Sequence, residues 1–304
     1  MKRFNNTNAI MLFVSVALLL SGCKKEENQY SGVSEAFSVS PDKQVFFSKG
    51  NLQYQASTNT WRFAENQWDC ISNGNENISD TYDGWIDLFG WGTSGHNHGA
   101  VSYQPWSTSD DSRCYYAYGE DFYHLYDQTG LADWGCNTIS NAESQTAQWR
   151  TLTKEEWEYV FYSRTTVSGI RYAKSFVNGV KGMVLVPDDW KETNFKLNNT
   201  NLYNAPFSSN EISREKWLKL FEAKGAVFLP VTGFRIGTEL HNIDEYGCYW
   251  SASFRNDRSS YYVLFNDGMF YANYYGTAYF NNYQEYITCG RCLGLSVRLV
   301  CDAE

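Results

Sequence analysis

Proline is scarce in this chain of 304 residues, and so are long apolar runs. There are five prolines, and after the first twenty residues no apolar stretch is long enough to cross a membrane. No tract rich in glycine and serine divides the remainder, so we expect one large domain. Positive charge is also in deficit, because 25 lysines and arginines face 34 aspartates and glutamates. Nucleic acid is therefore not an expected partner, since its phosphates require a basic protein face.

Clusters of metal ligands and catalytic groups are equally sparse. His96 and His98 lie on a glycine-flanked loop without an evident third ligand. Cys289 and Cys292 have the spacing of half a zinc site or of a redox dithiol, but no second pair follows them. We therefore expect no metal, no cofactor and no enzymatic activity. A hydrolase or oxidase that uses the loop from Asp83 to Tyr126 is the alternative.

The amino-terminal segment is typical of an exported lipoprotein. Lys2 and Arg3 precede an apolar run from Ala9 to Leu20, and Leu20-Ser21-Gly22-Cys23 follows. The run is short for a membrane span, and it ends in small residues before a cysteine, which indicates cleavage after export. We interpret residues 1–22 as a signal peptide, and Cys23 resembles the lipidated residue of bacterial lipoproteins. Its acyl chains would hold the protein on a membrane at about 0.8 kcal/mol per buried methylene.

Residues 23–36 are polar and predict a solvated tether. Within it, Lys24-Lys25-Glu26-Glu27 resembles the surface-export signal of Bacteroidetes lipoproteins. This resemblance implies an outer-membrane location with the domain, residues 37–304, facing outwards.

The chain has eight cysteines, and lipidation of Cys23 leaves an odd number that cannot pair completely. Disulfides are plausible in an oxidising exterior, but the sequence does not fix their connectivity. The seven remaining cysteines are Cys70, Cys114, Cys136, Cys248, Cys289, Cys292 and Cys301.

The order of predicted elements indicates an α+β fold. Residues 37–63 alternate and break like an antiparallel meander of short strands. Asn178-Gly179 predicts a hairpin between strands over 172–177 and 180–186. Further strands are expected over 226–229, 249–253, 261–265 and 295–300.

Two helix starts are marked by capping residues. Thr153 precedes Glu156 by three residues, the spacing of a capping box, and Leu152 can pack on Trp157 as a hydrophobic staple. Ser213 predicts a second cap, and Gly225 predicts the end of that helix.

The region from Tyr249 to Tyr286 is dense in tyrosine, phenylalanine, asparagine, serine and glycine. Binding loops favour this mixture, because tyrosine offers a large amphipathic contact area with few rotatable bonds. The alternative is an aromatic β core. Residues 272–283 show no sustained period-two alternation, which favours a binding segment.

Three stretches resemble the formylglycine-generating-enzyme-like family, whose fold is C-type lectin-like. They are Trp149-Arg150-Thr151-Leu152-Thr153-Lys154-Glu155-Glu156-Trp157-Glu158-Tyr159, Gly247-Cys248-Tyr249-Trp250-Ser251-Ala252-Ser253 and Gly294-Leu295-Ser296-Val297-Arg298-Leu299-Val300. Similar stretches occur in Fibrobacter-major-paralogous-like lipoproteins of Bacteroidetes and in the variable proteins of diversity-generating retroelements. The resemblance implies a single C-type lectin-like domain with two helices, short antiparallel strands and long loops. Residues 37–148 would supply amino-terminal strands and loops, and residues 149–304 a lectin-like core.

The same resemblance implies that residues 254–292 form a displayed binding segment, which retroelement mutagenesis diversifies in variable proteins. The cysteines do not match the closely spaced pair of the formylglycine-generating oxidase. The calcium-binding motifs of sugar-binding lectins are also absent, Gln104-Pro105-Trp106 being the nearest string. We expect a surface lipoprotein that binds a protein or glycan ligand; a structural subunit of the cell envelope is the alternative. The candidate ligand-binding residues are Phe254, Arg255, Asn256, Arg258, Tyr271, Tyr274, Tyr275, Tyr279, Asn281, Tyr283 and Tyr286.

Overall fold

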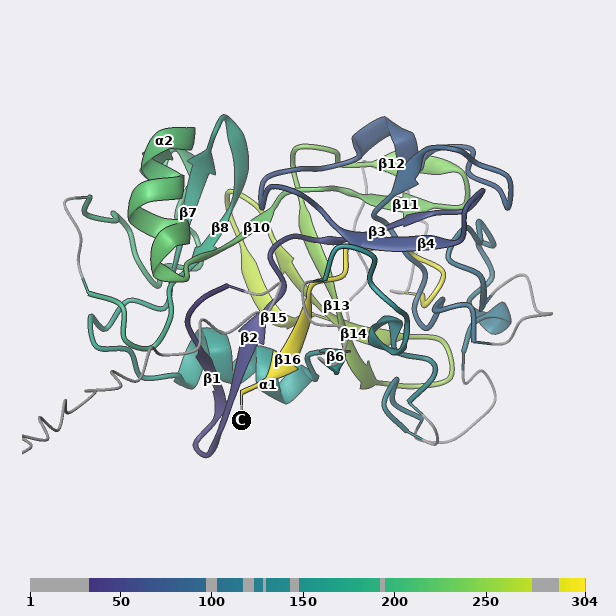
Figure 1. Cartoon of the computed structure of the whole chain (residues 1–304), viewed down its shortest axis with the longest axis horizontal. Helices are drawn as coiled ribbons and strands as arrows, with labels where there is room; N and C mark the ends of the chain where they lie inside the picture. The colour runs from purple at the N-terminus through teal and green to yellow at the C-terminus, as the bar shows by residue number, and fades with distance from the viewer. Residues whose placement is uncertain are drawn as a thin grey trace, which may run out of the picture.

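The computed structural model describes residues 33–96, 103–116, 123–127, 130–142, 148–191, 195–274 and 290–303. The fold is mixed α+β, with small and mostly antiparallel sheets and two short helices (Figure 1). No helix in these ranges is long and apolar enough to span a membrane.

The described residues form five sheets, of which four have three or four strands and one has two. One has the order β1 (Phe37–Ser40), β2 (Lys43–Phe47), β16 (Leu299–Asp302), β6 (Trp149–Thr151). A second has the order β10 (Val227–Pro230), β8 (Val180–Leu185), β7 (Tyr172–Val177), β9 (Glu211–Ile212). A third has the order β13 (Gly247–Phe254), β14 (Ser260–Phe265), β15 (Phe270–Tyr274). A fourth has the order β4 (Thr60–Phe63), β3 (Leu52–Gln55), β5 (Trp85–Ile86). The last is the hairpin of β11 (Phe234–Ile236) and β12 (Glu239–His241).

The helices begin where the capping residues predict. α1 (Lys154–Glu158) has a complete capping box between Thr153 and Glu156, and it continues into a π-helical turn, η5 (Tyr159–Ser163). The Glu156 carboxylate also accepts two hydrogen bonds from Arg150, at 2.7 and 2.8 Å, which fastens the helix to β6. The predicted first helix is thus confirmed, with its cap tied to the sheet that holds the carboxy-terminal strand.

The second helix is also confirmed, although its hydrogen bonding is irregular. Ser213 caps α2 (Arg214–Lys216), which continues through a π-helical turn, η7 (Trp217–Phe221), and a 3-10 turn, η8 (Glu222–Lys224). Gly225 ends it at φ +75°, a conformation that favours glycine. Four further short turns among the described residues are 3-10 helices: η1 (Ser72–Asn75), η3 (Ser112–Cys114), η4 (Trp134–Cys136) and η6 (Phe207–Ser209).

The Asn178-Gly179 hairpin is confirmed, with φ of +51° and +81° at its two turn residues. The predicted meander over residues 37–63 is wrong in part. β3 and β4 form a hairpin, but β2 pairs with β1 and β16 and lies in another sheet. The chain leaves the first sheet at Ser48, whose amide donates to the Leu299 carbonyl. The carboxy-terminal strand therefore takes the place next to β2 that a meander would give to β3.

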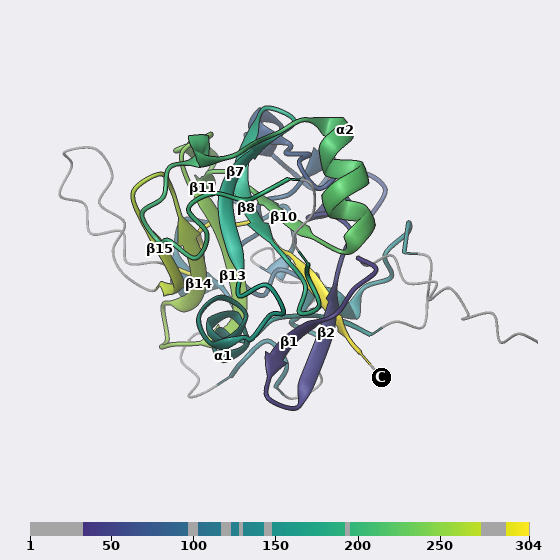
Figure 2. The same ribbon diagram turned by 90° about the vertical axis from the view of Figure 1, so that its left-hand side faces the viewer.

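Three clusters of buried side chains form the core. One surrounds Trp91, Trp134 and Trp250; we call it the first core. The second core includes Trp157 and Tyr249. A third cluster packs α2 and its continuation on the sheet of β7, β8 and β10, which lie together in Figure 2.

Fully buried arginines hold the irregular segments between these clusters. Arg298 on the carboxy-terminal side donates to the Gln67 side chain at 2.8 Å, the Asn51 side chain at 3.3 Å and the Lys49 carbonyl at 3.2 Å. Burial lowers the pKa of Arg298 to about 10. Its guanidinium therefore supplies hydrogen bonds to loop residues that are not paired in a strand.

Asp87 orders the loop between β4 and β5 and the strand end that follows. Its carboxylate accepts from the Ile71 amide at 3.0 Å and from the Asn75 side chain at 2.8 Å. Burial raises the pKa of Asp87 to about 6, although these hydrogen bonds favour the charged form.

Replacing Arg298 by Met should lower the free energy of unfolding by roughly 3 kcal/mol, because buried acceptors lose their donor. Urea unfolding of wild type and variant would measure the loss. Arg214→Met, at an exposed position, should stay within about 0.5 kcal/mol of wild type. A similarly small effect for Arg298→Met would contradict the stabilising role of its guanidinium.

The raised pKa of Asp87 makes stability depend on pH. Between about pH 4 and pH 6 the unfolded chain loses this proton while the folded chain keeps it, so the contribution to stability falls as pH rises. The rise of the Asp87 pKa from 3.8 to about 6 corresponds to roughly 3 kcal/mol. The free energy of unfolding of wild type, taken relative to that of Asp87→Asn, should therefore be higher at pH 4 than at pH 7 by about this amount. Equal pH slopes for both proteins would disprove the assignment.

Candidate functional site

The sheet of β13, β14 and β15 is covered on both faces. Trp250, Tyr262 and Leu264 point into the first core, whereas Phe265 and Phe270 point into the second. These residues are at most 5% exposed. The dense aromatic sequence up to Phe270 therefore forms core rather than surface, which corrects the interpretation of that part as a binding segment. A strand buried on both faces needs large apolar residues at successive positions.

Two tyrosines of β15 depart from this pattern. Tyr271 is 45% exposed, and Tyr274 is partly buried. Tyr271 lies opposite Leu264 and Tyr274 opposite Tyr262, so both rings are on the side of the first core. The Tyr274 ring is 5.5 Å from Tyr262 and 5.2 Å from Tyr271. Packing thus fixes the inner tyrosine and leaves the outer one open to solvent.

Side chains of the first helix hold the outer edge of β15. The Ala272 amide donates to the Tyr162 hydroxyl at 2.9 Å, and the Asn273 side chain donates to the Glu158 carboxylate. The Tyr162 ring is itself 46% exposed and packs 5.6 Å from Phe270. We call Tyr162, Tyr271 and Tyr274 the β15 surface. Tyr162 escaped the sequence prediction because it lies far from the aromatic segment in the chain.

The turn between β13 and β14 carries the predicted basic residues. Asn256 shapes it, because its side-chain oxygen accepts from the Arg258 amide at 3.0 Å and the Ser259 amide at 2.9 Å. Arg255 and Arg258 are exposed. Phe254 pairs with Ser260 and Tyr274 with Tyr262, so this turn and Tyr274 lie at the same end of the sheet.

A buried arginine supports that turn from below. Arg291 donates to the backbone carbonyls of Tyr116 and Asn256. Its guanidinium also lies 5.1 Å from the Trp91 ring centre and 4.8 Å from that of Phe254. Burial lowers the pKa of Arg291 to about 10, while the charge of Asp257 opposes that change. Phe254 is thus a packing partner of Arg291 as well as a predicted contact residue.

The opposite turn of the hairpin is held by a buried lysine. The Lys174 ammonium donates to the carbonyls of Asn266, Met269 and Tyr203, at 2.5, 3.1 and 2.8 Å. Burial lowers the pKa of Lys174 to about 8, and the carboxylate of Asp267 works against this. Buried cations therefore fix both turns that flank β14, and with them the strand that carries Tyr271.

Several predicted residues lie outside the described residues. They are Cys23, His98, Tyr275, Tyr279, Asn281, Tyr283, Tyr286 and Cys289. Of the predicted contact residues, the structure places Phe254, Arg255, Asn256, Arg258, Tyr271 and Tyr274 at least partly open to solvent.

The described cysteines and histidines form no evident reaction centre. Cys70, Cys114, Cys136, Cys292 and Cys301 are free thiols. Burial raises the pKa of Cys70 and Cys292, which keeps these thiols protonated and weakly nucleophilic. The His96 ring packs edge-on against Tyr103 and Tyr116. Within the described ranges, no group of three or more His, Cys, Asp or Glu residues could hold a metal ion.

Comparison of the chain with models of protein families, with curated proteins and with solved structures gives no match, so the residues themselves carry the functional argument.

Proposed function

We propose that this protein is a lipid-anchored surface protein that binds a protein or glycan ligand through the β15 surface and the adjacent 255–258 turn. The observation that carries the proposal is the exposed Tyr271 ring on a hairpin whose residues Tyr262, Phe265 and Phe270 are core. Tyrosine and arginine are the residue types that dominate binding energy at interfaces. Tyr274 lies at the same end of the sheet as the exposed Arg255 and Arg258, and its ring packs 5.2 Å from that of Tyr271.

Rigidity of the hairpin supports the same function. Binding requires side chains and loops to be ordered, and a preordered surface reduces that cost. Lys174 and Arg291 fix the backbone of the two turns before any ligand arrives. The proposed contact residues are therefore presented on a framework that need not fold around the ligand.

We further propose that the scaffold is C-type lectin-like. Its support is the pairing of the carboxy-terminal strand β16 with β2 near the amino-terminal end, together with two capped helices between them in the sequence. The lectin-like resemblance of Trp149–Tyr159 falls on β6 and α1, and that of Gly247–Ser253 falls on β13. These segments form the base from which β14 and β15 extend.

Tyr271→Ala and Tyr274→Ala should each weaken ligand binding about tenfold, equal to about 1.4 kcal/mol. The thermal unfolding midpoint should fall more for Tyr274→Ala, because Tyr274 is the more buried residue. Labelled protein on arrays of glycans and of extracellular protein domains would measure binding. Tyr203→Ala is the matched control, because its ring is 61% exposed and the substitution keeps the backbone carbonyl that accepts from Lys174. Equal binding by all variants to every wild-type ligand would refute the proposed surface.

Lipid anchoring has a separate test. Cys23→Ser should move the protein from the membrane fraction to the soluble fraction, because no acyl chain can then be attached at that position. Fractionation and mass spectrometry of the amino-terminal peptide would measure the change. Retention of the variant on membranes, with residues 1–22 removed, would show that another feature anchors the chain.

A further inference from the structure

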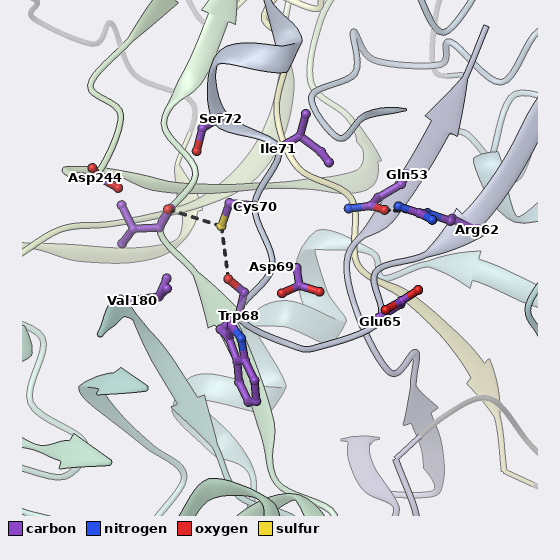
Figure 3. A pocket seen from close by; sticks show the side chains of 11 residues that line it. Gln53, Arg62, Glu65, Trp68, Asp69, Cys70, Ile71, Ser72, Val180 and Asp244 are labelled. Carbon is purple, nitrogen blue, oxygen red and sulfur yellow. Dashed lines mark hydrogen bonds between the residues drawn. The ribbon is translucent and has the colours of Figure 1, made fainter. Parts of the chain in front are cut away.

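A second concave site lies away from the β15 surface. It is a polar pocket of about 520 Å³ between the β3–β4 hairpin, the segment from Trp68 to Ser72 and the start of β8 (Figure 3). None of its lining residues belongs to the hairpin of β14 and β15.

One wall of the pocket offers hydrogen-bond donors. Gln53 is only 2% exposed, and its side-chain oxygen accepts from Nε of Arg62 at 2.8 Å. The amide nitrogen of Gln53 points into the pocket in Figure 3 and has no protein acceptor in the part of the chain that the structure describes. Because this donor is open to the pocket and is not used by the described part of the protein, it is available to a ligand or to water.

Arg62 strengthens that donor wall. Its guanidinium stacks 3.7 Å above the Trp85 ring, which holds the planar group in one orientation. Nε of Arg62 donates to the side-chain oxygen of Gln53, and the two terminal nitrogens of the guanidinium have no acceptor among the described residues. Such a guanidinium can donate two parallel hydrogen bonds to a carboxylate.

The remaining walls are acidic. Asp69 accepts from the Asn66 amide at 2.9 Å, whereas Glu65 and Asp244 are exposed and form no ion pair with any residue that the structure describes. Three carboxylates against one guanidinium give the lining a formal charge of −2. An anionic ligand is therefore disfavoured, and a ligand with a cationic group is favoured.

The floor of the pocket is not suited to a metal ion. The Cys70 thiol is directed at the carbonyls of Trp68 and Val231, at 3.7 and 3.8 Å, and burial raises its pKa. A protonated thiol is a poor metal ligand. The carboxylates are also not grouped for a metal ion in the described residues.

We propose that this pocket binds a small basic amino acid or the basic terminal residue of a peptide. The carboxylate or carbonyl of the ligand accepts from Gln53 and Arg62, and its ammonium or guanidinium groups face Asp69, Glu65 and Asp244. Such a ligand is complementary to both the donor wall and the acidic walls, and its positive charge offsets the charge of the lining.

Calorimetric titration of the mature chain with L-arginine and L-lysine tests the proposal. Binding should occur for both, and L-glutamate should show none, because the acidic walls repel it. Glu65→Gln and Asp244→Asn should each weaken binding about five- to tenfold, and added salt should weaken it further. Gln53→Glu should also reduce binding, because it replaces the free donor by a fourth carboxylate while keeping an acceptor for Arg62.

Glu76→Gln, which removes an exposed carboxylate outside the pocket, should leave the affinity unchanged. Tyr271→Ala should also leave it unchanged, which separates this site from the β15 surface. Absence of binding by both amino acids to folded wild-type protein would overturn the proposal. So would equal affinities in all pocket variants, or binding of neutral sugars in preference to the basic amino acids.

Discussion

The fold depends on buried guanidinium groups that donate to backbone carbonyls of irregular segments. Arg235 reaches the carbonyls of Gly237, Leu88 and Ser107, and Arg291 reaches those of Tyr116 and Asn256. Loops away from water must satisfy their polar backbone groups, and regular strands are too short here to do so. Five donors on one planar group let a single side chain serve several loops at once. The cost is desolvation of a charge, which lowers the pKa of Arg235, Arg291 and Arg298.

The same constraint shapes the proposed binding surface. Most aromatic side chains of β13 and β14 are needed between two cores, so only the edge strand and the turns are left to face solvent. Those turns would be mobile if their carbonyls were hydrated. Lys174 and Arg291 instead bind the carbonyls from inside the protein, which joins the positions of the contact residues to the core.

Local elements followed from the sequence where a few adjacent residues determine the backbone. Thr153 with Glu156, Ser213, and Asn178 with Gly179 specify their caps and turn through their own hydrogen bonds and allowed angles. The partner of β2 did not follow, because pairing with β16 joins residues separated by most of the chain. The aromatic segment was ambiguous for a related reason. Composition is the same for a contact surface and for a strand covered on both faces, and only the tertiary arrangement separates Phe270 from Tyr271.

Charge illustrates how weakly whole-chain composition constrains the two proposed sites. A net charge of −9 excludes a broad basic face, yet Arg255 and Arg258 form a locally positive turn. The pocket near Gln53 has the opposite local charge. Fields of exposed groups fade over about 8 Å at physiological ionic strength, so each site is governed by the residues that line it. An acidic protein can therefore present one surface suited to aromatic and anionic contacts and another suited to cations, provided that separate parts of the fold hold them.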